Sequence, residues 1–206
     1  MYFCTSVIEK NRAKIELYAH LFPILGETCV IFGAGPIGLL CLQAVMAAGA
    51  ARVIVVDIAE KRLEKARELG ASLIINGHEE NISQQIKSFA DGLGANVYFD
   101  AAGVQSTFTT GIASLRKGGR AILIGIFGKP VILDAFDLVV REITIKGTID
   151  YRHVFPEVIK LIDSKKIDVE RVITKKIKLN DIVKDGFEAL LSDPSEVKIL
   201  IDIASN

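Results

Sequence analysis

Apolar and polar segments alternate regularly along the first three quarters of the chain. Short apolar runs rich in valine and isoleucine, typical of buried parallel strands, are followed by segments with the apolar spacing of a helix. Strands are expected at residues 28–33, 52–57, 72–76, 95–103, 120–126 and 142–149, and helices at residues 36–49, 59–70, 79–91 and 105–119. Because β-α alternation with short connections gives parallel strands joined by right-handed crossovers, residues 26–149 are predicted to form an α/β domain with a doubly wound, six-stranded parallel sheet.

After residue 150 the pattern changes. Amphipathic helices are expected at residues 155–167 and 179–193, and strands at residues 171–179 and 197–203. This order departs from the β-α repeat and predicts a small α+β region. We therefore expect three parts: an atypical N-terminal segment (1–25), the sheet domain (26–149) and a C-terminal region (150–206).

Residues 29–51 contain no charged side chain, so they could be a membrane span, a buried core element or a backbone site for phosphate. Glycines and Pro36 interrupt the run, and neither Lys/Arg-rich flanks nor aromatic belts border it. We therefore interpret it as a buried strand and a buried helix separated by a glycine-rich turn.

The overall charge gives no sign of a polyanionic partner. Lysine plus arginine and aspartate plus glutamate each number 25, so nothing attracts nucleic acid or an anionic membrane surface in bulk. Cys4, Cys29 and Cys41 form no C-x-x-C pair, and residues 1–14 lack the pattern of a signal sequence. These features favour a cytoplasmic protein with reduced thiols.

The turn between the first expected strand and helix reads G-x-G-x-x-G, with glycines at 33, 35 and 38. In a Rossmann fold, Gly33 would permit the tight turn, Gly35 would let a pyrophosphate approach the backbone, and Gly38 would let the helix pack closely on the strand. The unpaired N–H groups of the helix N-terminus would then face the phosphates. Glycines also serve plain turns, so this pattern alone is weak evidence.

Asp57 strengthens the prediction of a dinucleotide site. It ends the second expected strand nineteen residues after Gly38, where a carboxylate can accept hydrogen bonds from the ribose hydroxyls of adenosine. Its charge would repel a 2′-phosphate, and Ile58 follows it where a cation would help, so the sequence favours NAD over NADP. Arg62, one helical turn further, either covers the adenosine or lies on a solvated helix face.

Several motifs in order carry a family resemblance from about Gly26 to the end of the chain. They are "GETCVIFGAGPIGLLCLQAVMAAGAARVIVVDIAEKRLEKARELGA", "FDAAG", "LRKGGRAILIGI" and "IKGTIDYRHVFPEVIKLI". This sequence resembles the zinc-dependent medium-chain dehydrogenases, in particular the branch of butanediol, sorbitol and threonine dehydrogenases. The resemblance implies NAD as cofactor, hydride transfer to or from a secondary alcohol or polyol, and a homo-oligomer.

The resemblance also implies which residues would contact NAD. For the implied residues that lie beyond the glycine turn, ordinary packing at strand ends is the alternative interpretation. The implied contacts are Gly33, Gly35, Pro36, Ile37 and Gly38 at the pyrophosphate, Asp57 and Arg62 at the adenosine, Ala101, Ala102 and Val104 alongside the cofactor, and Ile124, Gly125, Ile126, Thr148 and Ile149 near the nicotinamide.

The zinc-binding half that precedes the glycine turn in this family is not recognisable here. Cys4, His20 and Cys29 have neither the family's context nor the spacing of zinc ligands, and His78 and His153 are interpreted as solvated. We therefore assign no catalytic residue and no metal ligand, and expect a truncated chain whose activity alone is uncertain.

By the same resemblance, residues 150–206 would be the C-terminal part of the GroES-like catalytic domain, and Tyr151 and Arg152 would face the cleft. Two other functions stay open. One is a non-catalytic module that senses NAD or assembles with a partner chain, which the family-like C-terminal region disfavours. The other is a zinc-free quinone or enoyl reductase of the same superfamily, which Asp57 and the glycine pattern disfavour.

Overall fold

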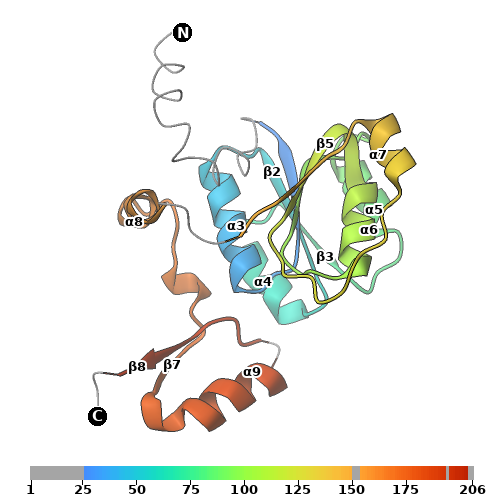
Figure 1. The fold of residues 1–206 in the computed structure, drawn as a ribbon. Helices are drawn as coiled ribbons and strands as arrows, with labels where there is room; N and C mark the ends of the chain where they lie inside the picture. The colour runs from blue at the N-terminus through green and yellow to red at the C-terminus, as the bar shows by residue number, and fades with distance from the viewer. Residues whose placement is uncertain (1–25, 150–153, 194, 204–206) are drawn as a thin grey trace.

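The computed structural model describes residues 26–149, 154–193 and 195–203, and its main feature is a parallel sheet (Figure 1). The strands are β1 (Thr28–Phe32), β2 (Arg52–Asp57), β3 (Leu73–Asn76), β4 (Ala95–Asp100), β5 (Leu115–Leu123) and β6 (Thr144–Gly147). They lie in the order β3-β2-β1-β4-β5-β6, and every neighbouring pair is parallel. This confirms the predicted doubly wound α/β sheet. The chain winds outward from β1 to β3 and then returns to place β4 beside β1, so the direction of winding reverses between β1 and β4.

Helices cover both faces of this sheet (Figure 1). They are α3 (Pro36–Ala47), α4 (Glu60–Glu68), α5 (Ile82–Phe89), α6 (Gln105–Ser114) and α7 (Ala135–Arg141). Side chains of α3 and α4 pack in one buried cluster, and side chains of α5 and α6 pack in a second. Successive residues of β1 alternate between the clusters, Ile31 in the first and Val30 and Phe32 in the second. A strand covered on both faces must be apolar throughout, which is why β1 and β2 read as continuous apolar runs.

Two details of the prediction were wrong. The helix expected to reach residue 119 ends at Ser114, and β5 begins directly at Leu115. The pairing of β5 with β4 shifts register near Gly118, whose φ of +71° an L side chain rarely adopts, so the glycines belong to an irregular strand start. In addition, α7 was not expected; Asp134 begins it by accepting hydrogen bonds from the N–H groups of Phe136 and Asp137.

The C-terminal region combines helices and strands, as predicted. It comprises α8 (Phe155–Asp163), a 3₁₀ turn (Glu170–Val172), β7 (Lys175–Lys178), a second 3₁₀ turn (Leu179–Asp181), a π-helical segment (Ile182–Glu188), α9 (Ala189–Ser192) and β8 (Ile199–Asp202). β7 and β8 form a separate two-stranded parallel sheet.

This region is attached to α3 by a small contact. The Gln43 side chain donates to the carbonyl O of Asp168 at 3.1 Å and accepts from the Asp168 N–H at 2.6 Å. Val172 and Val197 are buried in the same cluster as α3.

Helix α4 adds further contacts: Arg62 Nη2 lies 3.4 Å from the Glu196 carbonyl O, and the Glu68 carbonyl accepts from Arg171 Nη2 at 2.7 Å. Two helices of the sheet domain, α3 and α4, therefore hold the C-terminal region in place.

The uncharged run, residues 29–51, is divided between β1 and the 12-residue helix α3. A membrane span needs about 20 apolar helical residues. Over the part of the chain that the structure describes, no helix is both long and apolar enough to cross a bilayer.

Candidate dinucleotide site

The glycine turn lies at the carboxyl end of β1, beside the point where the sheet reverses its winding. Gly33 has φ of +99°, and a Cβ there would lie 3.0 Å from the carbonyl C of Ala101. A Cβ on Gly38 would lie 1.8 Å from the Gly33 carbonyl O, so only glycine lets α3 approach β1 this closely. A Cβ on Gly35 would meet nothing within 4 Å. The tight turn and the close helix packing are therefore as predicted, and the space beside Gly35 is open.

Helix α3 begins at this turn with its first N–H groups outside the helical hydrogen-bond ladder. Gly35 is the N-cap, and Pro36 follows it. The first hydrogen bond of the helix is donated by the Leu39 N–H to the Gly35 carbonyl O, at 3.0 Å. The first turn contains no acidic residue, and no side chain caps it. The N–H groups of Ile37 and Gly38 and the positive end of the helix dipole are thus suited to an anion.

Asp57 connects the end of β2 to this turn. Its Oδ2 accepts a hydrogen bond from the Ala34 N–H at 2.5 Å, and its Oδ1 accepts one from the Ala59 N–H at 2.8 Å. The carboxylate therefore lies between the glycine turn and the start of α4.

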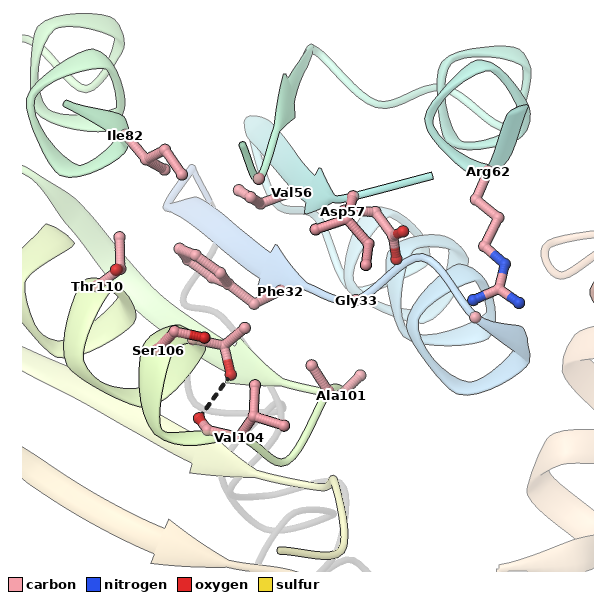
Figure 2. A pocket seen from close by; sticks show the side chains of 15 residues that line it. Phe32, Gly33, Val56, Asp57, Arg62, Ile82, Ala101, Val104, Ser106 and Thr110 are labelled. Carbon is pink, nitrogen blue, oxygen red and sulfur yellow. Dashed lines mark hydrogen bonds between the residues drawn. The ribbon is translucent and has the colours of Figure 1, made fainter. Parts of the chain in front are cut away.

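A cavity of about 470 Å³ opens beside this turn. Figure 2 shows Arg62 on one side, Ile82 and Thr110 on the other, and Asp57, Gly33 and Ala101 between them. The volume lies within the range of small-molecule sites, about 300–1,000 Å³. The cavity brings together seven of the residues expected to contact NAD: Gly33, Gly35, Asp57, Arg62, Ala101, Ala102 and Val104.

Other predicted residues lie outside the cavity lining, at the same edge of the sheet. Ile124, Gly125 and Ile126 follow β5, and Thr148 and Ile149 follow β6. Ile126 and Ile149 are 85% and 71% exposed, respectively, so this part of the edge is an open surface. Pro36, Ile37 and Gly38 belong to the start of α3 described above.

Sequence reasoning missed about half of the cavity lining. Ile58 was placed beside the ribose site by its position after Asp57, and the missed residues are Phe32, Val56, Gly77, Ile82, Ser106, Thr107 and Thr110. Gly77 follows β3 as Asp57 ends β2, so the rule that ligands bind at the carboxyl ends of parallel strands would have found it. Ser106 and Thr110 are four residues apart on α6 and share a helix face, but the pattern alone does not show that this face meets a cavity.

Arg62 lies on α4 and borders the cavity. Its Nη2 is 3.4 Å from the carbonyl O of Glu196 in the C-terminal region. Arg62 therefore joins α4 to the C-terminal region at the border of the cavity, and its contact with adenosine stays a prediction.

A buried carboxylate, Asp100, organises the loop after β4. Its Oδ1 accepts from the N–H groups of Ala102 and Gly103, at 2.9 and 2.7 Å. Its Oδ2 accepts from the hydroxyls of Tyr98 and Thr107. Burial, followed by the charge of Asp100, raises the pKa of the Tyr98 hydroxyl far above its ordinary value, so this group stays a donor. Asp100 was quoted in a family motif, but no role was predicted for it.

The same loop packs against the loop after β5 through glycine backbones. A Cβ on Gly103 would lie 2.7 Å from the Ile126 carbonyl O, and one on Gly125 would lie 2.7 Å from the Gly103 N. The Asp100 carbonyl accepts from the N–H groups of Ile124 and Gly125. The loops that carry Ala101 to Val104 and Ile124 to Ile126 are thus held together.

The described residues do not fit a zinc ion. Within residues 26–149, 154–193 and 195–203, no three His, Cys, Asp or Glu side chains gather as metal ligands would. Cys29 and Cys41 are buried, and burial raises the pKa of the Cys29 thiol to about 12 and that of Cys41 further, so neither offers a thiolate. Cys4, His20, Tyr151, Arg152 and His153 lie outside the described residues.

Comparisons with known proteins agree on a family. Residues 36–164 match the family model described as zinc-binding dehydrogenase. The (R,R)-butanediol dehydrogenase of Bacillus subtilis (strain 168) is 35% identical over 176 residues, which are 85% of this chain and 51% of that protein. The sorbitol dehydrogenase of Homo sapiens is 31% identical over 166 residues, 80% of this chain and 46% of that protein.

A solved structure shows the same likeness in three dimensions. The crystal structure of 2R,3R-butanediol dehydrogenase from Bacillus subtilis superposes with a TM-score of 0.82 at 35% identity, over 88% of this chain and 52% of that one. The chain therefore spans about half the length of the relatives that it matches.

Proposed function

This chain belongs to the zinc-binding dehydrogenase family, and from that membership we propose that residues 26–149 bind NAD at the carboxyl edge of the sheet. The observation that carries the proposal is a single arrangement. A glycine turn, an uncapped helix N-terminus and a carboxylate all meet at one cavity of about 470 Å³.

In the proposed pose, the pyrophosphate lies at the start of α3. Gly33 and Gly35 supply a backbone without side chains, and the N–H groups of Ile37 and Gly38 donate to phosphate oxygens, while Pro36 fixes the first helical residue. Helix N-termini bind phosphate through such N–H groups without a cationic side chain.

The adenosine half occupies the cavity. Asp57 accepts hydrogen bonds from the ribose hydroxyls, and Arg62 lies beside the ribose or the base. Ile58 and Val104 are exposed by 65% and 48%, respectively, at the cavity, and a flat aromatic base can cover such apolar side chains.

The nicotinamide half extends from the pyrophosphate toward the ends of β4, β5 and β6. Ala101 and Ala102 would line its path. Ile124, Gly125, Ile126, Thr148 and Ile149 would lie near the ring, since they follow β5 and β6 at the same edge of the sheet.

Asp57 favours NAD over NADP. At about 4 Å, its charge repels each unit charge of a 2′-phosphate by roughly 1 kcal/mol at the dielectric constant of water and about 4 kcal/mol at that of a protein surface. Ile58 supplies no compensating cation.

The whole protein would transfer a hydride between a secondary alcohol, such as a diol or polyol, and NAD. In enzymes of this kind, zinc acts as a Lewis acid on the alcohol oxygen. Because the described residues offer no fitting set of donors, we assign them NAD binding and no step of alcohol activation. Residues 154–203 would be the part of the catalytic domain that follows the sheet domain, and the protein would be a cytoplasmic homo-oligomer.

Titration of the purified chain with NADH and NADPH, followed by cofactor fluorescence, tests the NAD proposal. We expect saturable NADH binding at least about fivefold tighter than NADPH binding, the equivalent of roughly 1 kcal/mol. Equal affinity or a preference for NADPH would refute the role of Asp57, and absence of binding would refute the site.

Activity is tested separately. With NAD, added zinc and butanediol, sorbitol or threonine, we expect little or no turnover from this chain. Robust turnover would show that residues outside the described ones complete a metal site.

A further inference from the structure

The hydrogen bonds of Asp57 suggest a second role for this side chain. Its two oxygens each accept a backbone N–H, from Ala34 at 2.5 Å and from Ala59 at 2.8 Å. Ala34 lies inside the glycine turn, and Ala59 lies immediately before α4.

The turn needs such an acceptor because main-chain pairing between β1 and β2 ends just before it. The last bond of that series runs from the Gly33 N–H to the Val56 carbonyl at 2.7 Å. The chain then turns at Gly33, and Ala34 is fully buried. A buried N–H without a partner is costly, so Asp57 continues the pairing with a side-chain oxygen after the backbone has turned away.

The carboxylate has capacity for more than these two bonds. Two carboxylate oxygens offer about four acceptor positions. Two are used by Ala34 and Ala59, and the side chain also borders the cavity. One group can therefore hold the turn and still accept ribose hydroxyls.

We infer that Asp57 is a positioning residue of the glycine turn, in addition to the ribose contact given by the proposed function on which this inference rests. Through Ala34 it fixes the backbone that would meet the pyrophosphate. A substitution of Asp57 that admits a 2′-phosphate would consequently also weaken binding of the pyrophosphate, which NAD and NADP share.

Two ligands and two neutral variants separate the roles. ADP carries the ribose hydroxyls, and 2′,3′-dideoxy-ADP lacks them, so a residue that contacts only the ribose cannot affect dideoxy-ADP through that contact. Asp57→Asn and Asp57→Ala remove the same charge, but the asparagine oxygen can still accept one N–H. We expect the Asp57→Asn variant to bind dideoxy-ADP about threefold to tenfold more tightly than the Asp57→Ala variant in calorimetric titration.

Amide hydrogen exchange at Ala34, followed by NMR without ligand, reports the turn directly. We expect Asp57→Ala to accelerate this exchange at least about tenfold, because the N–H loses its acceptor. Asp134→Ala is the matched control: it also removes a carboxylate that accepts two N–H groups at the start of a helix, but at α7. It should leave Ala34 exchange and both affinities unchanged.

Unchanged Ala34 exchange in Asp57→Ala, together with equal dideoxy-ADP affinity of the two variants, would overturn the positioning role. A wild-type chain that binds neither nucleotide would overturn the proposed function alone. Faster Ala34 exchange in Asp57→Ala supports the positioning role whether or not the chain binds nucleotide.

Discussion

The long helix α3 of the sheet domain and the helices of the C-terminal region are buried to very different extents. Helix α3 is apolar on all sides and buries six of its residues, whereas the amphipathic α8 and the short α9 have no buried residue, like α7 at the edge of the sheet domain. Phe155, Phe187 and Leu191 are 58%, 59% and 89% exposed, respectively. An apolar stripe in a sequence therefore predicts that a helix has a face to bury, but not that the described part of the chain covers that face.

The two regions also differ in what stabilises them. The sheet domain has two buried clusters on opposite faces of six paired strands. The C-terminal region depends on a two-stranded sheet and on contacts with two helices of the sheet domain. Gln43 of α3 bonds Asp168, and Arg62 and Glu68 of α4 bond residues of the region. Phe155, Phe187 and Leu191 leave apolar side chains exposed on this region, and we predict that this surface promotes association of copies of the chain.

A pair of isoleucine substitutions should show the largest contrast between the regions. Ile54 in β2 is fully buried, and Ile159 in α8 is 54% exposed. We expect Ile54→Ala to lower the free energy of unfolding by about 2–5 kcal/mol and Ile159→Ala by less than about 1 kcal/mol. Urea unfolding followed by circular dichroism measures both. Equal losses would mean that the C-terminal region is packed as tightly as the sheet.

Two substitutions in the glycine turn should separate an effect on stability from an effect on nucleotide binding. Gly38→Ala places a methyl group against the Gly33 carbonyl, so we expect a loss of about 3 kcal/mol in stability and loss of ADP binding. Gly35→Ser points into open space and provides a favoured N-cap, so stability should stay within about 0.5 kcal/mol while the serine obstructs the phosphates. Thermal unfolding and ADP titration test both variants. Normal ADP affinity in Gly35→Ser would contradict the proposed pose.

Loss of Gln43 should detach the C-terminal region before the sheet unfolds. Gln43→Leu leaves the Asp168 N–H and carbonyl without their partner, at a cost of about 1–3 kcal/mol. We expect limited proteolysis to remove the C-terminal region faster in this variant. Gln84→Leu, on the exposed side of α5, is the control and should be cleaved like the wild type.

The smallest effect should be the pH dependence of one ion pair in the C-terminal region, Lys175 and Asp185. The hydrogen bond and charge of Lys175 hold the pKa of Asp185 below its ordinary value of 3.8. A lowered pKa in the folded state means that the contribution is present above about pH 4 and is lost as the pH falls through the folded pKa. NMR titration should place the Asp185 midpoint below 3.8 and move it toward that value in Lys175→Met. Lys176→Met, at the neighbouring exposed lysine, should leave it unchanged.

The sequence predicted the parts of the fold that local pattern controls. β1 and β2 are continuous apolar runs because both of their faces are buried, and Gly33 and Gly38 have the conformation and the close contact expected of them. The start of β5 was wrongly predicted to be helical, because the composition of residues 115–119 suits a last helical turn equally well. In the structure these residues begin a strand that pairs irregularly with β4.

The missed site residues depend on burial and on how neighbouring elements pack. In the sequence, Asp100 is only an acidic residue at the end of a strand. The structure shows that it is buried and accepts hydrogen bonds from Ala102, Gly103 and Thr107. Similarly, Ile82 and Thr110 border the cavity because α5 and α6 lie beside each other, which no spacing within either helix reveals.

Helix α3 makes Asp168 of the C-terminal region a reporter for the glycine turn at the start of that helix. At 12 residues it is about 18 Å long, with the glycine turn at its first residue and Gln43 in its second half. A rigid helix that shifts at one end shifts along its whole length. The Asp168 amide, hydrogen-bonded to Gln43, should therefore register occupancy of the phosphate end as a change in its NMR frequency, without a label inside the site.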